Sequence, residues 1–285
     1  MKVYDPVTDV SAVSQPGQDN TGTDPHLYGP LFVDVQMQGV FKDGKTFVDA
    51  VPKRLDPPAL CRLYLDSRRE PGFSLAAFVR EHFDLPPDSD ARDLRQRLTN
   101  VGIRQHIRDL WSQLVRTSGD AGDGEPQGTL LPLPHPYVVP GGRFREIYYW
   151  DSYFTIVGLV EDGLTGLAEG MVGNFASLID AHGHIPNGNR SYFLSRSQPP
   201  FFFKMIECVF ASDPEAGYAA YLPQLQREYA YWMDGETALE PDEAHAHLVR
   251  LPDGSLLNRF WDAQDEPREE SYRDDVHTAV SYTHL

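Results

Sequence analysis

The sequence LTGLAEGMVGNFASLIDAHG, residues 164–183, decides the fold class of this chain. Its large apolar residues recur mostly at spacings of three and four, which places them on one face of an α-helix; they are Leu167, Met171, Phe175, Leu178 and Ile179. Gly183 follows the last apolar turn, and glycine is the residue that most often ends a helix. The stretch therefore predicts an amphipathic helix over about 164–181.

Similar patterns lie on both sides of this stretch. We expect further helices over about 57–68, 74–83, 91–116, 146–161, 200–211 and 215–233, with Gly163 and Gly235 as additional glycine stops. A loop is expected over 117–128 and a short hairpin at Asp253-Gly254, but strand alternation is otherwise weak. The sequence thus predicts an all-α, or mainly α, chain of paired antiparallel helices.

Composition restricts the class of protein. The chain has 285 residues and a formal net charge of −17, which disfavours binding to nucleic acid or to an anionic membrane. Cys61 and Cys208 stand alone on separate apolar patterns, so we expect free buried thiols, no metal and no cofactor. Residues 1–26 are rich in small polar residues and proline, and they predict a flexible leader.

The cellular compartment follows from two sequence features. No apolar run of about 18 residues could cross a bilayer, and the first residues lack the apolar segment of a secretory signal. We therefore expect a cytoplasmic protein. A start site placed too far downstream would hide a signal and make the protein periplasmic or secreted.

Three loops concentrate polar and aromatic side chains. The first, residues 140–154, is a proline-glycine turn leading into a helix; the second is residues 183–200; and the third is residues 265–272. Aromatic rings can pack on the C–H faces of a sugar, while arginine and carboxylate groups can hold its hydroxyls. These loops therefore favour sugar binding. Their alternative interpretations are surface ion pairs at a helix start and a solvated charge run.

The order of residues in the first two loops resembles the trehalases, glycoside hydrolase family 37. The similarity extends from about Gly29 to about Ala279 and is carried by PGGRFREIYYWDSYF (140–154) and GHIPNGNRSYFLSRSQPP (183–200). It implies that residues 27–285 are the N-terminal portion of a single (α/α)6 barrel, or toroid, and that the substrate is trehalose, cleaved with inversion to two glucoses. It also implies substrate contacts by Arg143, Trp150, Asp151, Asn187, Arg196, Ser197, Gln198, Arg268, Glu269 and Glu270.

The same resemblance separates binding from proton transfer. In this family the general acid lies in a Ser-Gly-Trp-Asp-like segment and the base is a glutamate nearer the C-terminus, and neither motif occurs in residues 1–285. We expect both groups beyond Leu285, in which case the sequence is a truncated or frame-shifted form that is inactive by itself. Asp151, Asp262 and Glu270 are accordingly assigned to binding. The alternative is a helical protein that binds a sugar without cleaving it.

Overall fold

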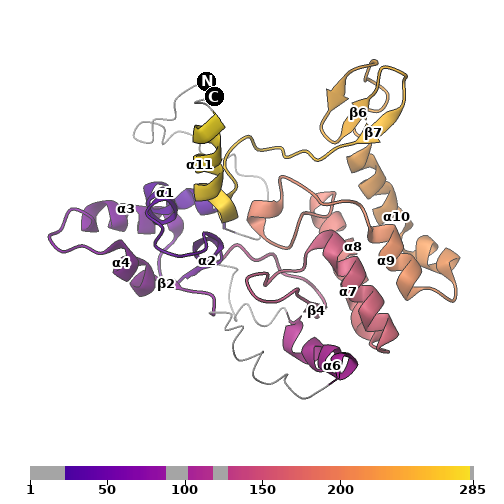
Figure 1. The fold of residues 1–285 in the computed structure, drawn as a ribbon, viewed down its shortest axis with the longest axis horizontal. Coiled ribbons are helices and arrows are strands. Elements are labelled where there is room, and N and C mark those ends of the chain that lie inside the picture. The colour runs from indigo at the N-terminus through magenta and orange to yellow at the C-terminus, as the bar shows by residue number, and fades with distance from the viewer. Residues whose placement is uncertain (1–22, 88–101, 118–127, 283–285) are drawn as a thin grey trace. The chain divides into compact units, whose positions relative to one another are not determined.

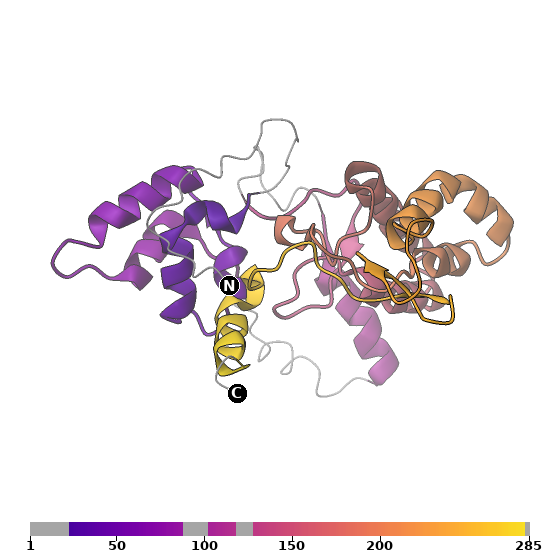
Figure 2. The same ribbon diagram turned by 90° about the horizontal axis from the view of Figure 1, so that it is seen from above.

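The computed structural model describes residues 23–87, 102–117 and 128–282, with side chains to residue 280. These residues form two compact units, which are described separately (Figures 1 and 2). The first unit comprises Met1–Pro86, Glu125–Thr129 and Pro267–Leu285; the second comprises Pro87–Gly124 and Leu130–Glu266. The expected leader lies, up to residue 22, outside the described residues.

The first unit is built mainly from short helices. They are η1 (Pro25–Tyr28), α1 (Pro30–Met37), α2 (Lys45–Val48), α3 (Pro57–Ser67), α4 (Leu75–His82), η4 (Glu269–Ser271) and α11 (Tyr272–Tyr282). Strands β1 (Val51–Pro52) and β2 (Phe83–Asp84) pair antiparallel. Helices α1 and α11 pack together although they come from opposite ends of the chain.

Aromatic side chains fill the core of the first unit. The Phe47 ring lies 5.2 Å from Phe83 and 6.5 Å from Phe32, and Phe32 meets Tyr272 of α11 edge-on at 5.1 Å. Beside them, the buried Lys45 Nζ bonds to Asp49 Oδ2 at 2.6 Å, so both charges are paired away from water.

The second unit holds the longer helices. They are α6 (Ile103–Leu114), α7 (Tyr149–Glu161), α8 (Thr165–His182), η3 (Ser191–Phe193), α9 (Phe202–Val209) and α10 (Pro214–Trp232). Strands β3 (Val115–Arg116) and β4 (Tyr137–Val138) pair antiparallel. Helices α7, α8, α9 and α10 pack against one another, and the apolar face of α8 predicted from the sequence is buried in their common core.

Local signals place the helix ends as the sequence predicts. The Asp56 carboxylate accepts from Ala59 N at the start of α3 (2.7 Å), and Ser74 Oγ accepts from Ala77 N at the start of α4 (3.4 Å). Gly183 ends α8 with φ of 80°, a left-handed conformation that costs glycine little. Helix α7, in contrast, begins at Tyr149 and not at Glu146.

The expected hairpin is also present. Strands β5 (Ala244–His245), β6 (Leu248–Arg250) and β7 (Leu256–Asn258) form a three-stranded antiparallel sheet. Gly254 turns the chain between β6 and β7 with φ of 86°. Arg250 fixes this turn, since its guanidinium donates to the Gly254, Leu239 and Glu236 carbonyls.

The described residues confirm the mainly α class. Closure of an (α/α)6 barrel stays a prediction, and so does the single domain over residues 27–285. The helix expected over 91–116 is described only from Ile103, because residues 88–101 lie outside the described part. Cys61 and Cys208 are free, although both are partly exposed. Among the described helices, none has both the length and the apolar character to cross a membrane.

A matched pair of glycine substitutions tests the α8 boundary. Gly183→Ala is expected to lower the free energy of unfolding by about 1–2 kcal/mol, because a Cβ atom is strained in the left-handed conformation. Gly166 lies near the other end of α8 with open space around the position of a Cβ atom. Gly166→Ala should be neutral or stabilise by up to about 1 kcal/mol. Urea denaturation followed by circular dichroism measures both, and equal effects would contradict the assignment.

Candidate functional site

The first loop presents Arg143 on a tight turn. Gly141 and Phe144 exchange backbone hydrogen bonds of 3.1 Å in both directions, and Gly141 and Gly142 have φ of 95° and 62°. The exposed Arg143 guanidinium lies over the Phe144 ring, 5.6 Å from its centroid. The glycines therefore make a turn that carries an arginine and an aromatic ring at the surface.

Trp150 and Asp151 occupy the first turn of α7, and both are exposed. A carboxylate at this place is stabilised by the positive end of the helix dipole. The Trp150 ring packs near Phe154 and Phe201, with centroids 6.1 Å away in each case. The start of α7 thus offers an aromatic surface next to an acceptor for hydroxyl groups.

The second loop lies directly against the first. Tyr149 N donates to the Asn187 carbonyl at 3.1 Å, and Trp150 N donates to Gln198 Oε1 at 3.3 Å. Tyr148 and Gly188 form an antiparallel bridge. A Cβ atom on Gly188 would lie 2.8 Å from the Ile147 carbonyl oxygen, so this approach requires glycine.

Asn187, Arg196 and Ser197 are in direct contact with one another. With its amide oriented to satisfy both ends, Asn187 accepts from Arg196 Nε at 3.3 Å and donates to the Ser197 carbonyl at 3.0 Å. Ser197 Oγ donates to the Ile185 carbonyl at 2.6 Å. Five of the predicted residues are therefore joined through backbone or side-chain contacts: Trp150, Asn187, Arg196, Ser197 and Gln198.

A row of aromatic rings runs between the two arginines of these loops. Phe144, under Arg143, meets Tyr148 at 5.5 Å, and Tyr148 meets Phe193 at 5.7 Å. The Arg196 guanidinium lies 5.2 Å from the Phe193 centroid. Arg143 and Arg196 thus belong to one region of the second unit, with cation–π contacts at both ends of the row.

Sequence reasoning missed the buried groups that fix these loops. Glu146 is fully buried, and its carboxylate accepts from Arg190 Nε (2.7 Å), Arg145 N (3.0 Å) and Tyr148 Oη (3.0 Å). Asn189, also fully buried, accepts from Ile147 N and donates to the Leu131 carbonyl, both at 2.9 Å. Their burial explains why α7 begins after Glu146 and not at it.

The third predicted loop lies in the first unit. Arg268 makes a two-pronged ion pair with Asp275, of 2.9 Å from Nε and 2.7 Å from Nη2. Glu269 is buried, and its Oε1 lies 3.2 Å from His26 Nε2. Since Arg268, Glu269 and Glu270 belong to a different unit from the other candidates, their convergence on the same pocket stays a prediction.

One group of possible metal ligands occurs among the described residues. Ligand atoms of Asp24, His26 and Glu269 lie within 4.8 Å of one another in the first unit. The pairing of His26 with Glu269 and the capping of His26 N by Asp24 (2.8 Å) account for this proximity without an ion.

His184 of the second unit stacks on Tyr231, and burial lowers its pKa to about 4, so that its imidazole is neutral near pH 7.

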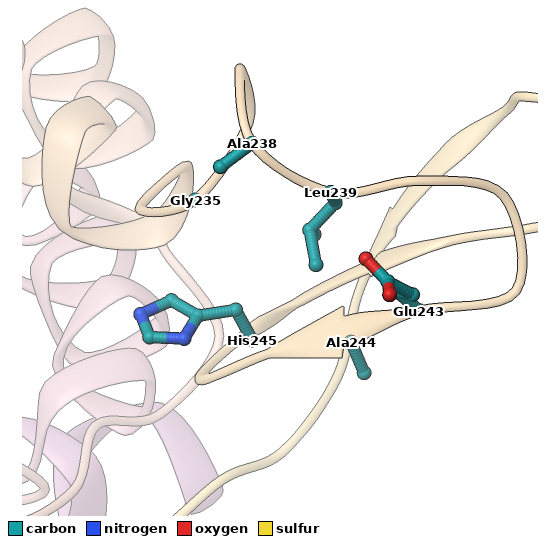
Figure 3. Close-up of a pocket in the computed structure, with 6 residues that line it drawn as sticks. All are labelled: Gly235, Ala238, Leu239, Glu243, Ala244 and His245. Atoms are coloured by element: carbon teal, nitrogen blue, oxygen red, sulfur yellow. The ribbon is translucent and has the colours of Figure 1, made fainter.

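A separate hollow lies at the C-terminal end of α10. It has a volume of about 430 Å³ and is lined by Gly235, Ala238, Leu239, Glu243, Ala244 and His245. Figure 3 shows the Leu239, Glu243 and His245 side chains around it. None of the predicted substrate residues lines this hollow, so it does not belong to the site formed by the two loops.

Comparisons with known proteins agree with the motif resemblance. The family model described as trehalase matches residues 39–284. A periplasmic trehalase of Xanthomonas axonopodis pv. citri is 52% identical over 256 residues, covering 90% of this chain and 44% of the relative. A periplasmic trehalase of Pseudomonas aeruginosa is 51% identical over 253 residues, with 89% and 45% covered.

The chain spans less than half the length of these relatives. A solved structure, a neutral trehalase from Saccharomyces cerevisiae, is 35% identical, with a TM-score of 0.37 and coverage of 53% of this chain and 27% of that one. The expectation of a cytoplasmic protein is wrong, because the similar bacterial proteins are named periplasmic trehalases. That expectation depended on two absences, of an apolar spanning run and of a secretory signal in the first residues, and neither defines the compartment.

Proposed function

This chain belongs to the trehalase family, and from that premise we propose that it carries sugar-binding loops of a periplasmic enzyme that hydrolyses α,α-trehalose to two glucoses with inversion. The periplasmic location is proposed from the names of its relatives. The substrate and the reaction are proposed from the family, since the chain corresponds to only part of each relative.

The observation that carries this proposal is the direct contact between the two loops of the second unit. Gln198 accepts from the Trp150 backbone N–H, and the Asn187 amide contacts both Arg196 and Ser197. Such an arrangement supports sugar recognition, because hydrogen-bonding side chains of the second loop lie against the start of α7, which carries the exposed Trp150 ring. Arg143 and Asp151 extend the same surface in the proposed site.

The chemistry assigned to these residues is binding and orientation. The arginines and Asn187 would hold vicinal hydroxyls, Trp150 would cover an apolar sugar face, and Asp151 would accept from a hydroxyl. Inversion additionally requires an acid and a base about 6.5–9.5 Å apart. We propose that these two carboxylates belong to a segment outside residues 1–285, where the family's acid and base motifs would lie. The roles of Arg268, Glu269 and Glu270 are proposed from the resemblance alone.

Glucose release from trehalose tests this function. The complete enzyme is obtained by joining these residues to the remaining segment of the Xanthomonas axonopodis relative, and it should hydrolyse trehalose in preference to maltose or sucrose. Residues 1–285 alone should be at least about 10²–10⁴-fold slower for each missing proton-transfer group. Trehalose binding without turnover by the complete enzyme would favour the non-catalytic sugar-binding alternative. Comparable turnover by residues 1–285 would instead assign proton transfer to Asp151 or Asp262.

A further inference from the structure

We propose that Asp262 is a positioning residue for substrate recognition, which orients the Arg196 guanidinium toward the sugar. This inference rests on the proposed function, and it deepens that function by adding a residue outside the three matched loop assignments. It is carried by the geometry around Arg196 in the second unit.

Asp262 contacts Arg196 through both its side chain and its backbone. Arg196 Nη1 donates to Asp262 Oδ2 at 3.0 Å, and the two residues form an antiparallel bridge. The next residue, Ala263, donates its N–H to the Ser195 carbonyl at 3.0 Å. The segment after β7 is therefore held against the second loop at the place where the ion pair forms.

Arg196 has little freedom in this environment. It is 2% exposed, its face lies over Phe193, and Nε donates to the Asn187 amide. A buried guanidinium requires a carboxylate partner, because the loss of hydration is otherwise uncompensated. Since the guanidinium is planar and rigid, contacts at Nη1 and Nε define the directions of its other N–H groups.

Asp262 is suited to an indirect role. Oδ2 accepts from Arg196, while Oδ1 accepts from Gln264 N at 3.0 Å. Both carboxylate oxygens are thus engaged by protein donors, and the side chain is only 16% exposed. We therefore assign sugar contact to Arg196 and orientation of Arg196 to Asp262.

The hairpin brings Asp262 to this position. Asn258, at the end of β7, donates to the Trp232 carbonyl of α10 at 2.7 Å, and Arg259 N donates to the His247 carbonyl at 2.7 Å. These bonds fix the chain just before Asp262. A residue 66 positions away in the sequence thereby acts on the second loop.

Kinetics of the Asp262→Asn variant in the complete enzyme provide the first test. The variant keeps the size of the side chain but loses its charge, and kcat/KM for trehalose should fall by about 10²-fold through misorientation of Arg196. Asp262→Glu should recover part of this loss. Asp180→Asn is the matched control, because Asp180 pairs with Arg227 at an exposed position of the same unit and should leave kcat/KM unchanged. Melting temperatures verify that each variant folds.

Chemical rescue separates positioning from general support of the fold. Millimolar guanidinium should restore part of the activity of Arg196→Ala, because Asp262 can hold the free cation where the side chain was. The rescue should disappear in Arg196→Ala/Asp262→Asn. Equal rescue in the two variants, or full activity of Asp262→Asn, would overturn the inference while leaving the proposed function intact. An unsubstituted complete enzyme that releases no glucose would instead overturn the proposed function, and this inference with it.

Discussion

Glu146→Ala is expected to lower the free energy of unfolding by about 3–5 kcal/mol, since it removes one partner of a buried ion pair. The Glu146 carboxylate is fully buried and accepts from the side chains of Arg190 and Tyr148 and from the backbone N–H of Arg145. Without this carboxylate, the Arg190 guanidinium, which is 6% exposed, is left with a charge that water cannot reach freely. Urea denaturation followed by circular dichroism measures the loss.

Asp180→Ala serves as the control for this substitution. The Asp180 carboxylate also pairs with an arginine, Arg227, but its side chain is 49% exposed. Solvent can replace the lost interaction there, so the expected change is within about 1 kcal/mol. Should Glu146→Ala prove as mild as this control, the buried network would not be what fixes the first loop against the second.

The fold class was predictable because helix periodicity is a local property. The apolar stripe of α8 and the glycine at its end predicted a helix that the structure contains almost residue for residue. The start of α7 was not predictable in the same way. Glu146 has a good helical propensity, but its carboxylate is used in a buried network with Arg190, which is distant in sequence.

The candidate site was partly predictable for a related reason. Motif order assigned Trp150, Asn187 and Gln198 to one site, and the first two loops are in contact, while substrate binding by these residues stays a prediction. It did not identify Asn189 as a structural residue, although Asn189 lies in the same motif as Asn187 and bonds to backbone groups from two other segments. Whether a polar side chain faces a substrate or the protein interior depends on packing between segments, which sequence spacing does not specify.

A second buried acid connects three helices of the second unit. Tyr149, at the start of α7, donates its hydroxyl to Glu228 of α10 and accepts from Phe202 N of α9 at 3.0 Å. Glu228 is 5% exposed. Burial raises its pKa from 4.5 to about 7, although the hydrogen bond from Tyr149 acts in the opposite direction. The loss of hydration therefore dominates, and the Glu228 carboxyl stays protonated to a higher pH in the folded chain than in the unfolded chain.

Glu228→Gln should make the chain more stable than the unsubstituted form at pH 8. Because the folded-state pKa is raised, the stability linked to Glu228 is fully present below its unfolded value of 4.5 and is lost as pH rises through about 7. One pKa unit corresponds to about 1.4 kcal/mol, so this contribution should change by about 3 kcal/mol between pH 4 and pH 8. Glutamine keeps an acceptor for the Tyr149 hydroxyl but cannot ionise.

The measurement is the free energy of unfolding from urea titrations at several pH values, taken as the difference between Glu228→Gln and the unsubstituted chain. Taking the difference removes the contributions of all other titrating groups that the substitution leaves unchanged. Glu215→Gln is the control for replacing a carboxyl by an amide, because Glu215 is exposed in the first turn of the same helix. A flat difference for Glu228→Gln would mean that the Glu228 carboxylate ionises in the folded chain as it does in water, and that water reaches the junction of α7, α9 and α10.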